Sequence, residues 1–247
     1  IPKKLDLVII STTSTRRYDL TKLISEKYKV KNFIVEKIVE RSPKKLVEFL
    51  KLSKKINIYV SLPFRASKFF NYIKKIKKKK FKFKVLTNES TLASNGIHFA
   101  DVASFVLSKK IDNIDTSGVK SWSNGKRKGF KEFFGTLKME YEKNKVLILI
   151  NDVTKKKSIC SINIDNDRYL IKDYYEKILI NNSSIFKSNS LSVSIVMKNE
   201  IRKILNKKST ILPTYEKIHA NHHIYIKSLL DNYNLLNNRK LRYLPIS

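Results

Sequence analysis

The chain has 247 residues, of which 42% are hydrophobic and 11% aromatic, so it is long enough to bury a sizeable core and too apolar to be disordered. No apolar run approaches the ~20 residues that span a bilayer, and the N-terminus shows no signal-peptide pattern. The single cysteine, Cys160, excludes an intramolecular disulfide and a cysteine-based zinc site. We therefore expect a globular, cytoplasmic protein with no membrane partner.

The formal net charge of +31 suggests a nucleic-acid partner at first sight, because an excess of cations attracts phosphate backbones. The distribution argues against it, since lysines are scattered through every segment and Asn and Ile are abundant too, as A- and T-rich codons would produce. The one dense run, KKIKKKKFKFK at 74–84, is typical of the solvated end of a helix that leads into a strand. Nucleic-acid binding is therefore kept only as a third alternative.

The first part of the chain alternates between strands and helices. Continuous apolar runs at 5–11, 32–37 and 56–62 are typical of strands buried on both faces. Helices are predicted at 18–29, at 42–55, where Ser42 and Pro43 form a strong start signal, and at about 66–79. This rhythm predicts a parallel α/β sheet with right-handed crossovers.

After about residue 110 the pattern changes to strands joined by tight turns. GTLKMEYEKNKVLILIND predicts two strands around a Lys143-Asn144 turn, and KSICSINIDNDRYLIKD predicts two more around an Asn-Asp turn. We expect these strands to form an antiparallel meander. Two helices are predicted to follow, at 191–208 and, just after Pro213, at 214–233.

The segment NGIHFADV at 95–102 places one of only four histidines among residues that normally face a core. Asn95 and Gly96 precede His98, and Asp101 follows it by three residues, which predicts the first turn of a buried helix. Taken alone, such a histidine is more often a core residue bonded to a carbonyl. Asp101 alone is equally well explained as a brace for the helix start.

Three segments, LDLVIISTTSTRRYDL, FIVEKIVERSPKKLVEF and NGIHFADVASFVL, together resemble the Gfo/Idh/MocA oxidoreductases. That family has a strand ending in Ala-Thr-Pro or similar, a second ending in Glu-Lys-Pro, and later a Gly-x-His-x-x-Asp helix start. The resemblance covers nearly the whole chain, and it extends to the branch found among capsule and surface-polysaccharide genes. It implies a partial Rossmann-type, dinucleotide-binding parallel sheet at 1–88. A C-terminal α+β domain, with a mostly antiparallel open sheet and a last helix that packs back on the first domain, is implied at 89–247.

The G-x-G-x-x-G fingerprint of a dinucleotide-binding domain does not occur in the sequence. The resemblance begins at what would be the fourth strand of the family's nucleotide-binding domain, so it implies a fragment without the first half of that domain. It also implies NAD or NADP as cofactor, with the choice between them open, and a sugar or nucleotide-sugar as substrate. The antiparallel sheet commonly mediates oligomers in this family, which implies a homo-oligomer.

Carried over residue by residue, the resemblance assigns a role to each candidate. Cofactor contacts are implied for Thr12, Thr13, Glu36 and Lys37, catalysis for His98 and Lys37, and substrate contacts for Arg65, Asn95, Asp101 and His222. Two positions depart from the pattern. Ile38 replaces the proline, which implies a less constrained backbone, and Ser94 stands where many members carry an acidic residue, so a carboxylate relay to His98 is not implied.

The chemistry of these side chains agrees with those roles. A histidine with a pKa near ~6.5 is suited to remove a hydroxyl proton at neutral pH. A lysine at the C-terminal end of a strand lies where open α/β sheets place ligands, and its cation can stabilise an alkoxide. Lys37 and Arg65 are, without the resemblance, ordinary strand-end and surface cations. His219 and His223 are one helical turn apart, but no acidic third ligand accompanies them, so we expect no metal site.

The leading interpretation is therefore an NAD(P)-dependent oxidoreductase that transfers a hydride between the nicotinamide and a sugar or nucleotide-sugar in surface-polysaccharide synthesis. The first alternative is a non-catalytic remnant or sugar-binding protein of the same fold. The missing glycine-rich segment separates the two, because the pyrophosphate would lack its helix N-terminus. The basic nucleic-acid binder remains the second alternative.

Overall fold

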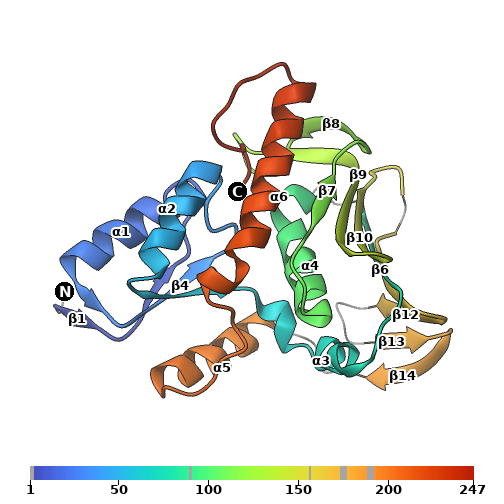
Figure 1. Cartoon of the computed structure of the whole chain (residues 1–247), viewed down its shortest axis with the longest axis horizontal. Helices are drawn as coiled ribbons and strands as arrows, with labels where there is room; N and C mark the ends of the chain where they lie inside the picture. Colours follow the sequence, from blue (N-terminus) through green and yellow to red (C-terminus); the bar gives the residue numbers. More distant parts are fainter. Residues whose placement is uncertain (1–2, 89–90, 156, 173–176, 188–191) are drawn as a thin grey trace.

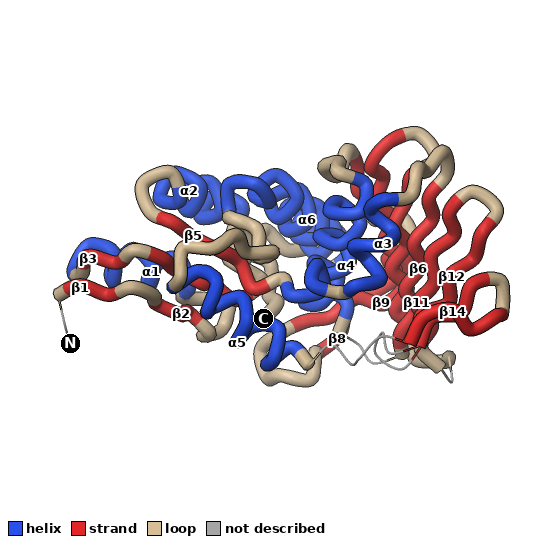
Figure 2. Tube along the Cα trace, turned by 90° about the horizontal axis from the view of Figure 1, so that it is seen from below, coloured by secondary structure: helices blue, strands red, loops and turns tan. Residues whose placement is uncertain are grey.

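A computed structural model of the chain describes residues 3–88, 91–155, 157–172, 177–187 and 192–247. Two main sheets lie at opposite ends of the molecule, with helices between them (Figures 1 and 2). The smaller is three-stranded and the larger nine-stranded, and a two-stranded ladder joins β1 (Lys4–Leu5) to β3 (Lys29–Val30). The predicted combination of a parallel sheet with a mostly antiparallel sheet and helices is confirmed.

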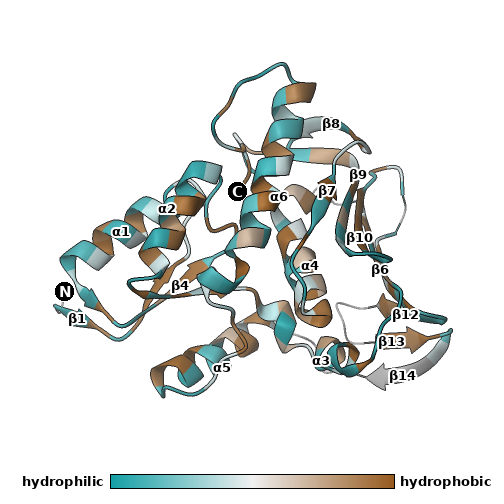
Figure 3. Cartoon of the chain, in the orientation of Figure 1, coloured by the Kyte–Doolittle hydropathy of each residue, from teal (hydrophilic) through white to brown (hydrophobic). Residues whose placement is uncertain are grey.

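The small sheet is parallel throughout, as predicted, in the order β2-β4-β5. The central strand β4 is buried on both faces: Phe33 and Val35 belong to the main core, whereas Ile34, between them, packs against Ile204 of α5. The edge strand β2 is less covered, since its Ile9 is exposed. Figure 3 shows the resulting apolar colour of β4. The elements of this part are β2 (Val8–Ile10), α1 (Arg17–Lys27), β4 (Asn32–Glu36), α2 (Pro43–Ser53), β5 (Asn57–Ser61) and α5 (Val193–Leu205).

The large sheet is built along the path β14-β13-β12-β11-β6-β10-β9-β7, with β8 paired to β9. The Lys143-Asn144 turn was predicted correctly, since Asn144 (φ 64°) lies between β9 and β10. The turn between β11 and β12 lies one residue earlier than predicted, at Asp165 (φ 50°) and Asn166, and Asp167 already belongs to β12. The strands are β6 (Phe81–Thr87), β7 (Asn113–Asp115), β8 (Val119–Asn124), β9 (Lys131–Glu142), β10 (Lys145–Asn151), β11 (Ile159–Ile164), β12 (Asp167–Lys172), β13 (Lys177–Ile180) and β14 (Ser183–Lys187).

The predicted uninterrupted meander is wrong in one respect, because β6 is inserted between β10 and β11. It pairs parallel with β10 and antiparallel with β11. Phe81, Phe83 and Val85 alternate inward along β6 and join the buried core, so this lysine-rich segment has an apolar side for the sheet to bury. The large sheet thus takes a strand from within 1–88, and the division at residue 88 stays a prediction.

The inner face of the large sheet is covered by α3 (Lys68–Lys75), α4 (Leu92–Leu107) and α6 (Tyr215–Leu236). A short 3-10 turn, η1 (Pro63–Ala66), precedes α3, so the predicted helix at 66–79 is shorter than expected, and the lysine run begins in its last turn at Lys74 and Lys75. The last helix contacts both parts of the molecule, since Tyr215 of α6 donates a hydrogen bond to the Leu46 carbonyl of α2 at 3.0 Å. No helix in the described ranges is long and apolar enough to cross a membrane.

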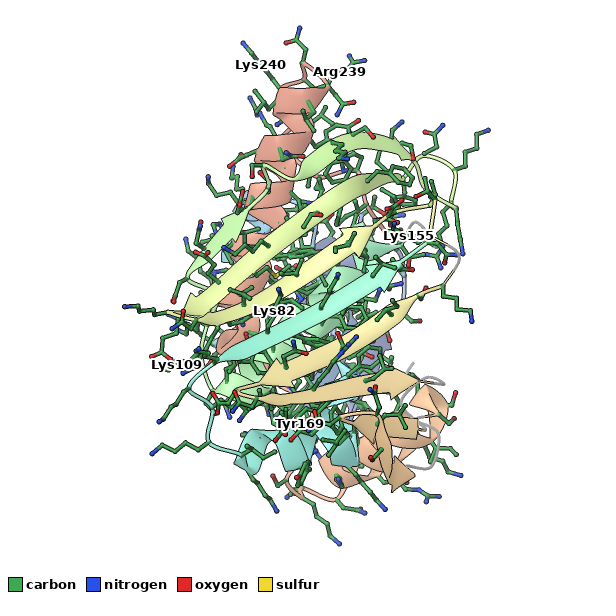
Figure 4. The ribbon with its side chains drawn as sticks, turned by 90° about the vertical axis from the view of Figure 1, so that its right-hand side faces the viewer. Lys82, Lys109, Lys155, Tyr169, Arg239 and Lys240 are labelled. Carbon is green, nitrogen blue, oxygen red and sulfur yellow. The ribbon has the colours of Figure 1, made fainter. Side chains whose placement is uncertain are left out.

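The outer face of the large sheet has no cover within the described residues. Along β10, Leu147 and Leu149 are buried, while the alternating Val146, Ile148 and Ile150 on the outer side are half-buried. Figure 4 shows this face, with Lys82 near its middle and Lys109, Lys155, Arg239 and Lys240 around the rim. The labelled cations are therefore spread over the view rather than gathered in one stripe.

Candidate active site

Helix α4 carries several predicted site residues along one of its sides. Asn95, His98 and Asp101 follow one another at intervals of three residues, which places them on the same side of the helix. The helix begins at Leu92, so His98 lies in its second turn, whereas the sequence predicted the first. The Asn-Gly pair is therefore inside the helix.

Gly96 has a packing reason to be glycine. A Cβ at this position would lie 2.5 Å from Tyr225 Oη and 2.7 Å from Leu149 Cδ1, both too close for any side chain. Tyr225 of α6 uses this space to donate hydrogen bonds to the Leu92 and Ala93 carbonyls, at 2.8 and 3.1 Å. The missing side chain thus lets α6 approach the first turn of α4 closely.

Lys37 connects the small sheet to α4. It follows β4 directly, and its Nζ donates hydrogen bonds to the Ser94 carbonyl at 3.1 Å and to Asn95 Oδ1. Burial lowers the pKa of Lys37 to about 8, against a smaller opposing effect of the Glu36 carboxylate. The Lys37–Ile38 peptide bond is cis although residue 38 is not proline.

Arg65 and Asp101 form a two-pronged ion pair. Arg65 Nε donates to Asp101 Oδ2 at 2.7 Å, and Nη2 donates to Oδ1 at 2.6 Å. Only 3% of the Asp101 side chain and 14% of the Arg65 side chain are exposed. Burial raises the pKa of Asp101, and the guanidinium opposes this rise. The two predicted substrate contacts therefore meet each other, and both oxygens of the carboxylate are engaged.

His98 lies between Lys37 and the η1 turn. Its ring stacks on Phe64 with centroids 4.7 Å apart, and its buried Nδ1 has no hydrogen-bond partner among the described residues. Burial lowers the pKa of His98 well below its usual value, and the charges of Lys37 and His222 act in the same direction. His98 is therefore neutral at pH 7, with a ring nitrogen able to accept a proton.

His222 of α6 is buried, with 1% exposure, on the side of the helix that faces α4. Neither of its ring nitrogens has a hydrogen-bond partner of normal geometry within the described part of the chain, although the Ile218 backbone one turn earlier favours protonation slightly. Burial lowers the pKa of His222 to about 3. The half-buried imidazole of His98 and the buried imidazole of His222, both neutral and each with an unpartnered nitrogen, are thus coupled electrostatically between α4 and α6.

Thr12 and Thr13 are exposed in the loop after β2, and their hydroxyls make local bonds to Thr13 and Thr15. The residue that holds this loop is Arg17, which no sequence pattern had indicated. Its guanidinium donates to the Thr12 carbonyl and to the Ile38 carbonyl, and so ties the ends of β2 and β4 together. Because burial lowers the pKa of Arg17 to about 10, a bound anion here would meet a strongly desolvated cation.

Glu132, at the start of β9, was also missed. Its side chain accepts hydrogen bonds from the Ala93 amide at 2.7 Å and the Ser94 hydroxyl at 3.2 Å, so it caps the first turn of α4. Burial raises its pKa to about 7, while these bonds and the Lys37 charge pull in the other direction. No local pattern marks this residue, because its partners lie nearly 40 positions away in the sequence.

The half-buried Lys37 lies at the carboxyl end of a parallel strand, where open α/β sheets bind ligands, and it acts electrostatically on the neutral His98 of α4. The histidine can take a proton and the ammonium can stabilise a developing negative charge on oxygen. Among the described residues, no group of three His, Cys, Asp or Glu side chains is arranged to hold a metal ion.

No protein-family model matches the chain, and a search of curated proteins finds no match. Solved structures do match. An oxidoreductase from Agrobacterium radiobacter, solved with NAD+, L-tartaric acid and magnesium, has a TM-score of 0.66 at 15% identity, over 95% of this chain and 79% of that one. UDP-N-acetylglucosamine 3-dehydrogenase from Acidithiobacillus ferrooxidans has a TM-score of 0.67 at 10% identity, over 94% and 79%. A super-repressor mutant of Gal80p from Saccharomyces cerevisiae has a TM-score of 0.65 at 12% identity, over 93% and 78%.

Identities this low establish the fold and nothing finer. The chain shares the fold of these solved structures, which include an oxidoreductase, a dehydrogenase and a repressor mutant. The fold expected from the three sequence segments is confirmed to this extent, whereas the roles expected of individual residues remain proposals.

Proposed function

We propose that the protein is an NAD(P)-dependent oxidoreductase that transfers a hydride between the nicotinamide and a carbon of a sugar or nucleotide-sugar. The observation that carries the proposal is the pairing of Lys37 and His98, both taken out of bulk water on facing elements of this fold. Similar structures include one solved with NAD+ and one named as a nucleotide-sugar dehydrogenase, which favours this substrate class.

In this proposal His98 removes the proton from the substrate hydroxyl as the carbon gives up its hydride. A neutral imidazole is required for this, and burial provides it at pH 7. Lys37 holds the oxygen through its ammonium and stabilises the negative charge that develops there. His222 donates or accepts a hydrogen bond at a second hydroxyl, which would satisfy a nitrogen that is otherwise buried without a partner.

The nicotinamide cofactor supplies the hydride acceptor when bound. The residues present fit its nicotinamide end: Glu36 and Lys37 lie at the end of β4, and the exposed Thr12 and Thr13 follow the neighbouring parallel strand. They do not include a glycine-rich loop for the pyrophosphate, because the 247 residues contain five glycines and no G-x-G-x-x-G. NAD and NADP are equally compatible with this part of the site.

The proposal is tested by titrating the purified chain with NADH and NADPH, following dinucleotide fluorescence, and then assaying a panel of free sugars and uridine diphosphate sugars. We expect His98→Asn and Lys37→Met to reduce kcat at least a hundredfold with little change in dinucleotide affinity. His219→Asn is the matched control and should leave turnover unchanged, because this half-buried histidine bonds Tyr215 Oη at 3.0 Å and has no role in the proposed site. Hydride transfer that survives both active-site substitutions would refute the assigned roles.

A second candidate function is a non-catalytic protein that binds a sugar. One structure of the same fold is named as a repressor mutant rather than an enzyme, which favours this candidate. This candidate predicts sugar binding, measured by calorimetry, without any binding of NADH or NADPH. Binding of either dinucleotide at micromolar concentration decides against it.

The wider context belongs to the same proposal. We place the protein in the cytoplasm, in the synthesis of surface polysaccharide, and we propose a homo-oligomer formed through the uncovered face of the large sheet. The half-buried Val146, Ile148 and Ile150 support this assembly, because apolar side chains on an open sheet face gain from burial in an interface. Light scattering should give a mass above that of one chain, and Ile148→Lys should lower it.

A further inference from the structure

Glu132 is a buried carboxylate to which the mechanism above gives no task. Its side chain is 6% exposed, and both oxygens are engaged: Oε2 by the Ala93 amide and Oε1 by the Ser94 hydroxyl. A buried carboxylate costs free energy unless it is well bonded, and a serine or asparagine side chain would cap a helix without that cost. Its place beside the active-site lysine therefore calls for an explanation in terms of charge.

Residue 94 lies between Glu132 and Lys37. Its hydroxyl bonds to the Glu132 carboxylate, while its backbone carbonyl accepts a hydrogen bond from Lys37 Nζ at 3.1 Å. The next residue, Asn95, supplies the second acceptor for the same ammonium. Whatever fixes the first turn of α4 therefore also fixes the two oxygens that hold Lys37.

We infer that Glu132 is a positioning residue for Lys37: it anchors the first turn of α4 so that the Ser94 carbonyl and Asn95 Oδ1 meet the ammonium, and its negative charge keeps that ammonium protonated. Ser94 itself is uncharged, so the carboxylate at the first turn of α4 is that of Glu132, which belongs to the strand β9. The inference rests on the proposed function in that it gives Lys37 its catalytic task.

The electrostatics of the pair agree with the geometry. The Glu132 charge raises the pKa of Lys37 against the larger effect of burial, and the Lys37 charge lowers the pKa of Glu132 in return. Burial brings the pKa of Lys37 to about 8 and that of Glu132 to about 7, so each group stays ionised near neutral pH only with help from its surroundings. Removal of the carboxylate should therefore release the proton of Lys37 at a lower pH.

The test measures Lys37 itself and needs neither cofactor nor substrate. Acetic anhydride labels each lysine in proportion to its unprotonated fraction, and peptide mass spectrometry across a pH series gives the midpoint for Lys37. In Glu132→Gln we expect this midpoint to fall by at least about half a pH unit, a threefold change in the protonated-to-neutral ratio. Glu140→Gln, which removes an exposed carboxylate from the same strand, is the matched control and should leave it in place.

Two further variants separate positioning from mere helix capping. Glu132→Asp keeps the charge with a shorter reach, and the double variant Glu132→Gln with Ser94→Asp returns a carboxylate to the same turn; both should restore the midpoint at least in part. A Glu132→Gln protein that is folded, by the fluorescence of its single Trp122, but labels at Lys37 as the native protein does would overturn the inference. Lower stability with an unchanged midpoint would overturn it equally, since that is the result for a cap alone.

The same variants also distinguish this inference from the proposed function. In an active enzyme, Glu132→Gln should lower kcat with little change in KM and should move the basic limb of the pH profile to lower pH. A shifted labelling midpoint in a protein that oxidises no sugar leaves the inference standing and refutes the proposed function. An unshifted midpoint in an active enzyme overturns the inference and leaves the proposed function standing.

Discussion

The Arg65–Asp101 pair offers the sharpest test of the structure, because the sequence suggests a substrate contact for Arg65 and the structure shows an internal partner. Both Asp101 oxygens accept from the guanidinium at 2.6–2.7 Å, and the carboxylate is 3% exposed. Arg65→Ala would leave this charge buried and unpaired. Breaking a buried pair in this way costs about 3–5 kcal/mol of unfolding free energy.

The loss should depend on pH in a definite direction. Burial already raises the pKa of Asp101, and removal of the guanidinium, which opposes the rise, should raise it further. The unpaired Asp101 carboxyl group then becomes neutral by taking up a proton in the folded state, which removes the free-energy cost of a buried charge. The stability difference between Arg65→Ala and the native protein should therefore be larger at pH 8 than at pH 5.

Urea unfolding followed by the fluorescence of Trp122 is the assay, since this single tryptophan bonds Asn232 of α6 at 2.8 Å and reports on the same helical layer. Lys22→Ala, which breaks an exposed pair with Glu26 at 3.9 Å, is the control and should change little. The reasoning is refuted if Arg65→Ala costs less than about 1 kcal/mol at pH 8 and shows no pH dependence, because Arg65 would then be free for a ligand.

Three further outcomes are expected. Gly96→Ala should destabilise the protein by about 1–3 kcal/mol, and Tyr225→Phe in the same chain should recover part of that loss, as urea midpoints will show, because the added Cβ meets Tyr225 Oη at 2.5 Å. His222→Leu should leave stability unchanged or raise it by about 1 kcal/mol, because two unpartnered nitrogens leave the core, while substrate affinity in calorimetry falls. Because burial raises the pKa of Glu132 to about 7, the folded state binds more protons than the unfolded state between about pH 4.5 and 7. As the pH rises from about 4.5 to 7, the unfolding free energy of the native protein should therefore fall by up to about 3 kcal/mol relative to that of Glu132→Gln. If the two proteins show parallel curves of unfolding free energy against pH, the burial of Glu132 is contradicted.

Local sequence patterns were sufficient for most of the regular structure. Apolar runs predicted β2, β4 and β5, the Ser42-Pro43 signal placed the start of α2 at Pro43, and the turn residues at 143–144 separated β9 from β10. Each of these features depends on the few residues beside it, through side-chain periodicity, a fixed proline φ or a tolerated positive φ. Lys37 and His98 were found in the same way, because each stands in a short recognisable segment.

The tertiary structure decided where β6 lies, how α4 begins and which charges meet. Nothing near Phe81 tells whether that strand joins the small parallel sheet or is inserted between β10 and β11, since its alternating pattern suits either neighbour. The close approach of Tyr225 explains Gly96 inside a helix, where the sequence suggested a turn before one. These outcomes depend on contacts between residues far apart in the chain.

For function, the sequence by itself determined which kinds of side chain are available. It placed a histidine, His98, and a lysine, Lys37, at the ends of predicted elements, and it contains no glycine-rich fingerprint. Only the fold determined their chemistry. It pairs Arg65 with Asp101, bonds Glu132 to Ser94, and partly removes His98 and Lys37 from water so that their pKa values fall. The physical reason is that a pKa or an ion pair depends on desolvation and on neighbours in space, neither of which a local sequence pattern specifies.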